Sequence, residues 1–167
     1  MSGPRPTPRT RTITWEDPMI TAEKGRTMSG LEALRAVQSG ELPAPPIAVL
    51  MGMSLAEVEE GRVVFTVLPA EYHYNPIGVV HGGLAATVLD SALGCAVHST
   101  LSAGTGYTTL EIKVNYVRAI TQATGELRCE AKIIHQGGRI ATAEARVTDA
   151  AGKLYAHGTT TCIIFRP

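Results

Sequence analysis

The sequence predicts an α+β fold in which an antiparallel sheet wraps around one long central helix. The first observation is a helical segment over roughly residues 82–101 that is apolar on most sides and rich in small residues. A helix that is apolar nearly all round must be buried nearly all round. The second observation is a set of segments on both sides of it whose apolar and polar residues alternate, as in strands with one buried face.

The N-terminal region differs in composition from the rest of the chain. Residues 1–27 are polar, and their prolines alternate with arginines without a helical or strand period. We expect an extended or partly ordered arm there. The main domain is expected to span residues 47–167.

Residues 28–46 predict a short helix followed by a proline-rich connector. Leu31, Leu34 and Val37 share one helical face between residues 30 and 39. Ser29 can cap this helix together with a glutamate three residues later, and a glycine at position 40 is typical of a helix end.

From residue 47 the pattern predicts two strands, the long helix and then four strands. Short turns between successive strands make most neighbouring pairs antiparallel. The clearest alternating segments are residues 61–68, 126–133, 141–147 and 153–165.

Composition excludes several classes of protein. The 167 residues carry 15 basic and 15 acidic side chains, so a strongly basic nucleic-acid surface is not indicated. A net charge of zero offers little resistance to self-association. The three cysteines form no CxxC pair and the histidines have no metal spacing, which predicts neither a disulfide framework nor a metal site. No apolar run reaches membrane-spanning length and no secretory signal is evident, so we expect a cytoplasmic protein.

One carboxylate, Asp90, interrupts the apolar helix. Burying a carboxylate there costs free energy unless hydrogen-bond or charge partners compensate for it, so it is expected to have such partners or a function. The helix is preceded by an irregular loop that begins at Asn75 and ends at His81, and the helix opens with Gly82 and Gly83. Backbone amides at a helix start lack intrahelical partners and favour negative charge, so this glycine pair is a candidate oxyanion hole.

The spacing of these residues predicts an oligomer. Gly82 and Asp90 are eight residues apart, which is about 12 Å along a helix, too far for both to touch one carbonyl. Two antiparallel copies of the helix across a two-fold axis would bring each Gly82 near the other chain's Asp90. The chemical interpretation therefore requires two copies of the chain.

The stretch NPIGVVHGGLAATVLDS (75–91) resembles the signature of hotdog-fold acyl-CoA thioesterases, and within them the phenylacetate-degradation-type branch. The segment GYTTLEIKVNYVRAI (106–120) also matches that branch, although its usual Arg-Pro pair is Arg118-Ala119 here. The resemblance covers roughly residues 47–165. It implies a hotdog fold, dimers that can pair into tetramers, and hydrolysis of an acyl-CoA thioester without a metal or other cofactor.

The resemblance also implies roles for individual residues. Asp90 would activate water or attack the carbonyl, and the Gly82 amide would polarise the thioester oxygen. Asn75 would orient the water or the carbonyl, and His81 would support the loop by hydrogen bonding. The hydroxyl of Thr109, with Thr108 as its neighbour, would lie close to Asp90 on the subunit opposite Asn75 and Gly82.

The coenzyme requires basic groups at the mouth of the groove, because CoA carries several phosphates. Gly137, Gly138 and Arg139 are the best candidates, and Arg118 and Lys113 are weaker ones. The branch favours aromatic acyl groups and short to medium aliphatic chains. We expect residues near Tyr72, Tyr74, Leu84 and Val88 to line the acyl pocket.

Two other functions remain open. A hotdog hydratase or dehydratase would pair an aspartate with a catalytic histidine at a different spacing from that of His81 and Asp90. A non-catalytic acyl-CoA-binding regulator would keep the groove without needing Asp90.

Overall fold

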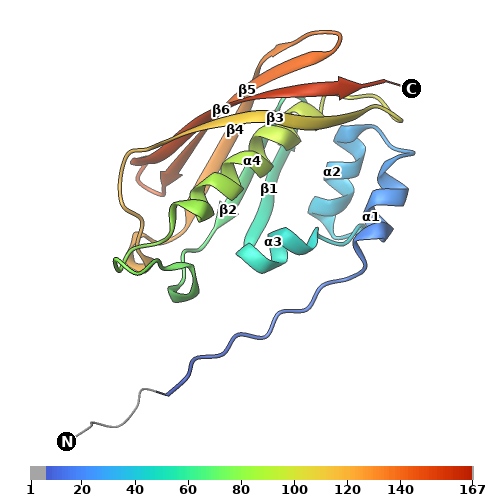
Figure 1. Cartoon of the computed structure of the whole chain (residues 1–167). Helices are drawn as coiled ribbons and strands as arrows, with labels where there is room; N and C mark the ends of the chain where they lie inside the picture. The colour runs from blue at the N-terminus through green and yellow to red at the C-terminus, as the bar shows by residue number, and fades with distance from the viewer. Residues whose placement is uncertain (1–6, 167) are drawn as a thin grey trace, which may run out of the picture.

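The computed structural model describes residues 7–166 and has a six-stranded antiparallel sheet curved around a long helix (Figure 1). The strand order is β1-β2-β4-β5-β6-β3, which leaves β3 at one edge. The strands are β1 (Met53–Glu59), β2 (Arg62–Val67), β3 (Gly106–Tyr116), β4 (Leu127–Gln136), β5 (Ile140–Asp149) and β6 (Leu154–Phe165). The predicted order of two strands, a long helix and four strands is therefore confirmed.

The long helix is α4 (Gly82–His98), which packs across the inner face of the sheet. On β4 and β5, the apolar residues of each alternating pattern are buried as predicted, except for Ile133 near the end of β4, which is half-buried. The helix ends at His98 rather than near residue 101, and tight turns follow. These turns also contact the start of the capped helix at residues 30–39, because Gly30 N–H donates to Leu101 O at 2.9 Å.

Three shorter helices precede the sheet: α1 (Pro18–Gly25), α2 (Gly30–Ser39) and α3 (Pro46–Met51). Helix α2 packs against β1 and the C-terminal part of α4 (Figure 1). Its predicted bounds and caps are confirmed: the Ser29 side chain accepts from Glu32 N–H, and Glu32 accepts from Ser29 N–H at 2.9 Å. Gly40 ends it in the left-handed conformation with φ of 81°. Two single-turn 3₁₀ helices, η1 (Glu71–His73) and η2 (Gln122–Thr124), lie in connecting loops.

Helix α3 was not expected from the sequence, which predicted the connector and then the first strand there. Neither was helix α1, which lies inside the N-terminal region. The Asp17 side chain caps it by accepting from Met19 N–H at 2.9 Å, and Pro18 occupies its first turn. An aspartate followed by a proline is a recognised helix start, so the signal was present. Residues 7–17 are extended as expected. Arg11 holds them by donating to two carbonyl oxygens at the end of α3 and by lying 4.0 Å above the Tyr72 ring.

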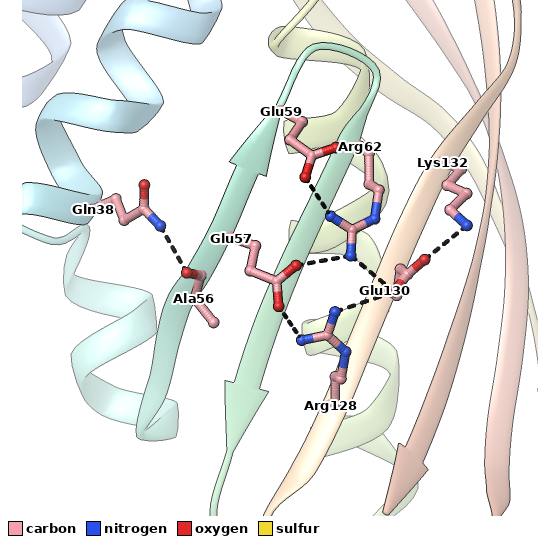
Figure 2. Close-up of polar contacts among 8 residues, drawn as sticks. All are labelled: Gln38, Ala56, Glu57, Glu59, Arg62, Arg128, Glu130 and Lys132. Carbon is pink, nitrogen blue, oxygen red and sulfur yellow. Dashed lines mark hydrogen bonds and ion pairs between the residues drawn. The ribbon is translucent and has the colours of Figure 1, made fainter. Parts of the chain in front are cut away.

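An ion-pair network ties β1, β2 and β4 together on the sheet's outer face (Figure 2). Glu57 pairs with Arg128 at 2.6 Å and with Arg62 at 2.8 Å. Glu130 pairs with both arginines at 3.2 Å and with Lys132 at 2.8 Å. Hydrogen bonds from these cations lower the pKa of Glu57 and of Glu130 to about 2.

Candidate active site

Asp90 lies on the side of α4 that the sheet does not cover. Its carboxylate is exposed, and Thr87 and Ser91 beside it are half-buried. The expectation that α4 is buried nearly all round is therefore wrong for a single chain. The opposite side of the helix meets β2 to β6, and the stripe that includes Gly83, Ala86 and Asp90 remains open.

A hydroxyl from β3 contacts the carboxylate, as the sequence analysis expects. Thr109 Oγ1 donates to Asp90 Oδ1 at 3.1 Å. A bulge directly after Thr109 shifts the register of β3 against β6. Thr108 precedes Thr109 and lies on the other face of the strand, because successive strand side chains alternate. The second carboxylate oxygen, Oδ2, makes no hydrogen bond to any residue of the described chain, 7–166.

Next to Asp90 is a cavity of about 220 Å³. Thr109 and Asp90 form its polar edge, and apolar side chains from α3, β1 and β2 form much of the rest. Its other lining residues are Pro45, Ile47, Ala48, Met53, Phe65, Ser91, Gly94, Cys95 and Tyr107. The carboxylate therefore borders an apolar space with the size of a small acyl group.

Two further side chains of this cavity stay uncharged. Burial, and secondarily the charge of Asp90, raises the pKa of the Cys95 thiol to about 12. Burial also raises the pKa of Tyr107 well above its usual range. The thiolate is the nucleophilic form of cysteine, so Cys95 is not a nucleophile near neutral pH.

Glycine at position 94 allows β3 to come close to α4 at the site. A Cβ atom on Gly94 would lie 3.0 Å from the Tyr107 hydroxyl and 3.2 Å from its ring. The Tyr107 ring also lies 5.4 Å from that of His98. These contacts place Tyr107 beside Asp90 and Thr109.

The loop before α4 is held by Asn75 and His81. Asn75 Oδ1 accepts from Ile77 N–H at 3.1 Å and from Val79 N–H at 3.4 Å. Its oxygen is therefore engaged within the loop, and only its NH₂ group is left to face a ligand. His81 caps α4, because its Nδ1 accepts from Gly83 N–H at 2.8 Å.

The Gly82 amide remains available. His81 occupies the Gly83 amide, whereas Gly82 N–H has no hydrogen-bond acceptor among residues 7–166. Tyr116, which the sequence analysis missed, lies over this glycine: a Cβ atom on Gly82 would be 3.1 Å from the Tyr116 ring. A larger residue here would displace that ring.

The candidate residues thus form two groups in one chain, which we name the candidate half-sites. Asp90 and Thr109 are hydrogen-bonded to each other, whereas His81 and Gly82 lie at the start of α4, after the loop that Asn75 holds. Eight helical residues separate Gly82 from Asp90, which is about 12 Å.

The coenzyme candidates occupy exposed positions, except for Gly137, which is half-buried. Arg139 lies in the β4–β5 turn, and its carbonyl oxygen accepts from Ile164 N–H. Ile164 lies on β6 and pairs with Tyr107 on β3. The turn with Gly137 and Gly138 is thus two strands from the end of β3 that carries Tyr107. Arg118 lies at the other end of β3 and donates to Leu154 O, and Lys113 lies between them on that strand.

The four residues around which the acyl lining is expected lie away from the cavity beside Asp90 in the single chain. Leu84 and Val88 are fully buried against the sheet, and Tyr72 is 54% exposed and bound to Arg11. The Tyr74 hydroxyl accepts from Gln122 N–H at 2.8 Å. None of the four lines the cavity beside Asp90.

The residues that do line it come from distant segments. Ser91, Gly94 and Cys95 follow Asp90 at helical spacing, so periodicity could have identified them. Met53 on β1 and Phe65 on β2 reach the cavity because these paired strands lie at its border in the folded chain, and no local pattern indicates this.

Within residues 7–166, no three side chains of the metal-binding types gather closely enough to hold an ion. None of the helices in this part of the chain has the length and apolarity needed to cross a membrane.

Comparisons with known proteins give consistent results. Residues 77–156 match the family described as the thioesterase superfamily. Human acyl-coenzyme A thioesterase 13 is 29% identical over 111 residues, which are 66% of this chain and 78% of the human one.

Two solved structures show the same fold. A conserved protein from Pseudomonas aeruginosa is 31% identical with a TM-score of 0.69, covering 73% of this chain and 95% of its own. A phenylacetic acid degradation-related protein from Ralstonia eutropha is 26% identical with a TM-score of 0.71, and the match covers 78% of this chain and 98% of the Ralstonia chain. The resemblance that the sequence indicates is thereby confirmed.

Proposed function

The chain belongs to the thioesterase superfamily and has its hotdog fold, and from that premise we propose that it hydrolyses an acyl-CoA thioester to the free acid and CoA at Asp90. The observation that carries the proposal is the Asp90–Thr109 pair at the edge of an apolar cavity. The human relative's name, acyl-coenzyme A thioesterase, supports CoA as the thiol.

The chemistry follows from the free groups at each half-site. Thr109 binds one carboxylate oxygen and leaves Oδ2 to accept a proton from water or to attack the carbonyl directly. The thioester oxygen accepts a hydrogen bond from Gly82 N–H as negative charge develops on it. By either route the C–S bond then breaks and CoA leaves as the thiol with one proton. Where Asp90 attacks directly, water next hydrolyses the Asp90–acyl anhydride, which releases the free acid and restores the carboxylate.

Each complete site would combine two chains. The uncovered stripe of α4 and the unpaired edge of β3 support an assembly in which a second copy lies against both. In that dimer, Gly82 and Asn75 of one chain approach Asp90 and Thr109 of the other. Arg139 and its neighbouring glycines would contact the CoA phosphates, with Arg118 as a weaker candidate.

The test is release of free thiol from a panel of aromatic and aliphatic acyl-CoAs by the wild-type protein and by Asp90→Asn. We expect the variant to lose at least about 10²-fold in kcat, the scale for loss of a general base or nucleophile. Glu144→Gln is the matched control, because it neutralises an exposed carboxylate on β5. Wild-type protein that releases no thiol while binding acyl-CoA tightly would favour the regulator instead.

A further inference from the structure

A second, larger cavity of about 750 Å³ adjoins the one beside Asp90. Its size falls within the roughly 300–1,000 Å³ of small-molecule sites. The residues that line both cavities are Pro45, Ala48, Met53, Phe65, Cys95 and Tyr107. The two cavities are therefore neighbours on either face of the same few side chains, and the shorter of these side chains decide how far a group beside Asp90 extends toward the larger space.

The N-terminal helices form the far wall of this larger cavity. Ala22 and Gly25 line it from α1, and Ala33, Leu34 and Val37 line it from α2. The residues matched by the thioesterase family begin only at position 77, so this wall comes from a part of the chain outside that match. The cavity is thus built by this chain's own N-terminal segment against the catalytic domain.

Its interior suits an uncharged, apolar occupant. Most of the lining side chains are apolar, and the charged residue Arg26 among them is exposed to solvent. The Gln38 side-chain amide donates a hydrogen bond to Ala56 O at 2.7 Å (Figure 2). His98 on the α4 side has its pKa lowered by burial, which favours the neutral ring.

We propose that this larger cavity, the acyl chamber, binds the aliphatic chain of a medium- or long-chain acyl-CoA, and that α1 and α2 set the accepted length. The inference rests on the proposed function and names its substrate class. The 220 Å³ cavity accommodates a short or single-ring acyl group by itself. The 750 Å³ chamber is filled only when the chain continues past Cys95 and Tyr107.

The first measurement is kcat/KM for acetyl-, butyryl-, octanoyl-, decanoyl- and phenylacetyl-CoA with the full-length protein. We expect kcat/KM to rise about three- to fourfold per added methylene until the chamber is filled, as burial of each CH₂ contributes to binding. Phenylacetyl-CoA should rank with the short chains.

The second measurement repeats the panel with the chamber narrowed from its N-terminal wall. Val37→Trp places an indole into the chamber, and Ala22→Trp does so from an exposed position where folding is at less risk. Either variant should lower the decanoyl-to-butyryl ratio of kcat/KM at least tenfold. Arg35→Trp, on the solvent side of α2, is the matched control and should leave the ratio unchanged.

The outcomes separate the two proposals. Hydrolysis without a rise with chain length, or an unchanged ratio in a folded Val37→Trp or Ala22→Trp protein, overturns the acyl chamber and leaves the thioesterase proposal standing. Absence of hydrolysis for every acyl-CoA overturns the proposed function, and the chamber proposal fails with it.

Discussion

At Asp90, a single side-chain hydrogen bond within the described chain orients the carboxylate, and it comes from Thr109. A hydrogen bond to a charged group contributes about 1.5–3 kcal/mol. We expect Thr109→Ala to lower kcat about tenfold or more, but less than Asp90→Asn does, while KM changes little. Thr109→Ser keeps the hydroxyl and should recover most of the activity. A large rise in KM with unchanged kcat would instead place Thr109 in substrate binding.

Also at the residue scale, Gly94 permits the close approach of Tyr107 to α4. We expect Gly94→Ala to reduce the free energy of unfolding by about 1–3 kcal/mol, because the added methyl group overpacks this contact. Urea denaturation measures the loss. Tyr107→Phe in the same chain removes the nearest atom, the hydroxyl at 3.0 Å, and should recover part of it. Equal stability of Gly94→Ala and wild type would contradict the packing that positions Tyr107.

At the scale of elements, β1, β2 and β4 are joined by the outer-face ion pairs (Figure 2). The folded pKa values of Glu57 and Glu130 are about 2, below the unfolded value near 4.3. The unfolded chain therefore binds more protons in this interval. The stabilisation is present above about pH 4.3 and is lost as pH falls toward 2.

We expect Glu130→Gln to lower the free energy of unfolding by roughly 1 kcal/mol at pH 7, the scale for partly exposed ion pairs. The difference between variant and wild type should shrink between pH 4.5 and about pH 2, where Glu130 becomes protonated. Chemical denaturation across this range tests it. A constant difference at every pH would show that the glutamate acts through packing and not through its charge.

At the scale of the whole molecule, the distance between the half-sites predicts complementation between chains. Asp90→Asn and Asn75→Ala chains should each be inactive alone. When the two variants are co-expressed, half of the dimers contain one chain of each variant. Each of these mixed dimers has one intact site out of two. We therefore expect about a quarter of the wild-type activity. No recovery in verified mixed dimers would place all the catalytic groups in one chain.

The alternating apolar and polar residues determined most of the fold. Strands such as 127–136 and 140–149, and the capped helix at 30–39, depend on local periodicity and cap chemistry, which act over a few residues. Helix α1 was predictable from Asp17 and Pro18, which are typical of a helix start. It has no buried residues, so no apolar periodicity accompanies this start. The adjacency of Thr109 to Asp90 came from a resemblance to known sequences, because nineteen residues separate the two in the chain.

Only the tertiary structure decided what surrounds Asp90. Its exposure depends on which side of α4 the sheet covers, and the apolar composition of the helix does not reveal that side. The smaller cavity is lined by residues from five elements and the larger by residues from seven, which the tertiary fold brings together. Local sequence therefore determined the elements and the chemistry of individual groups. Long-range packing determined the shape of the space they face, because that shape depends on contacts between residues far apart in the chain.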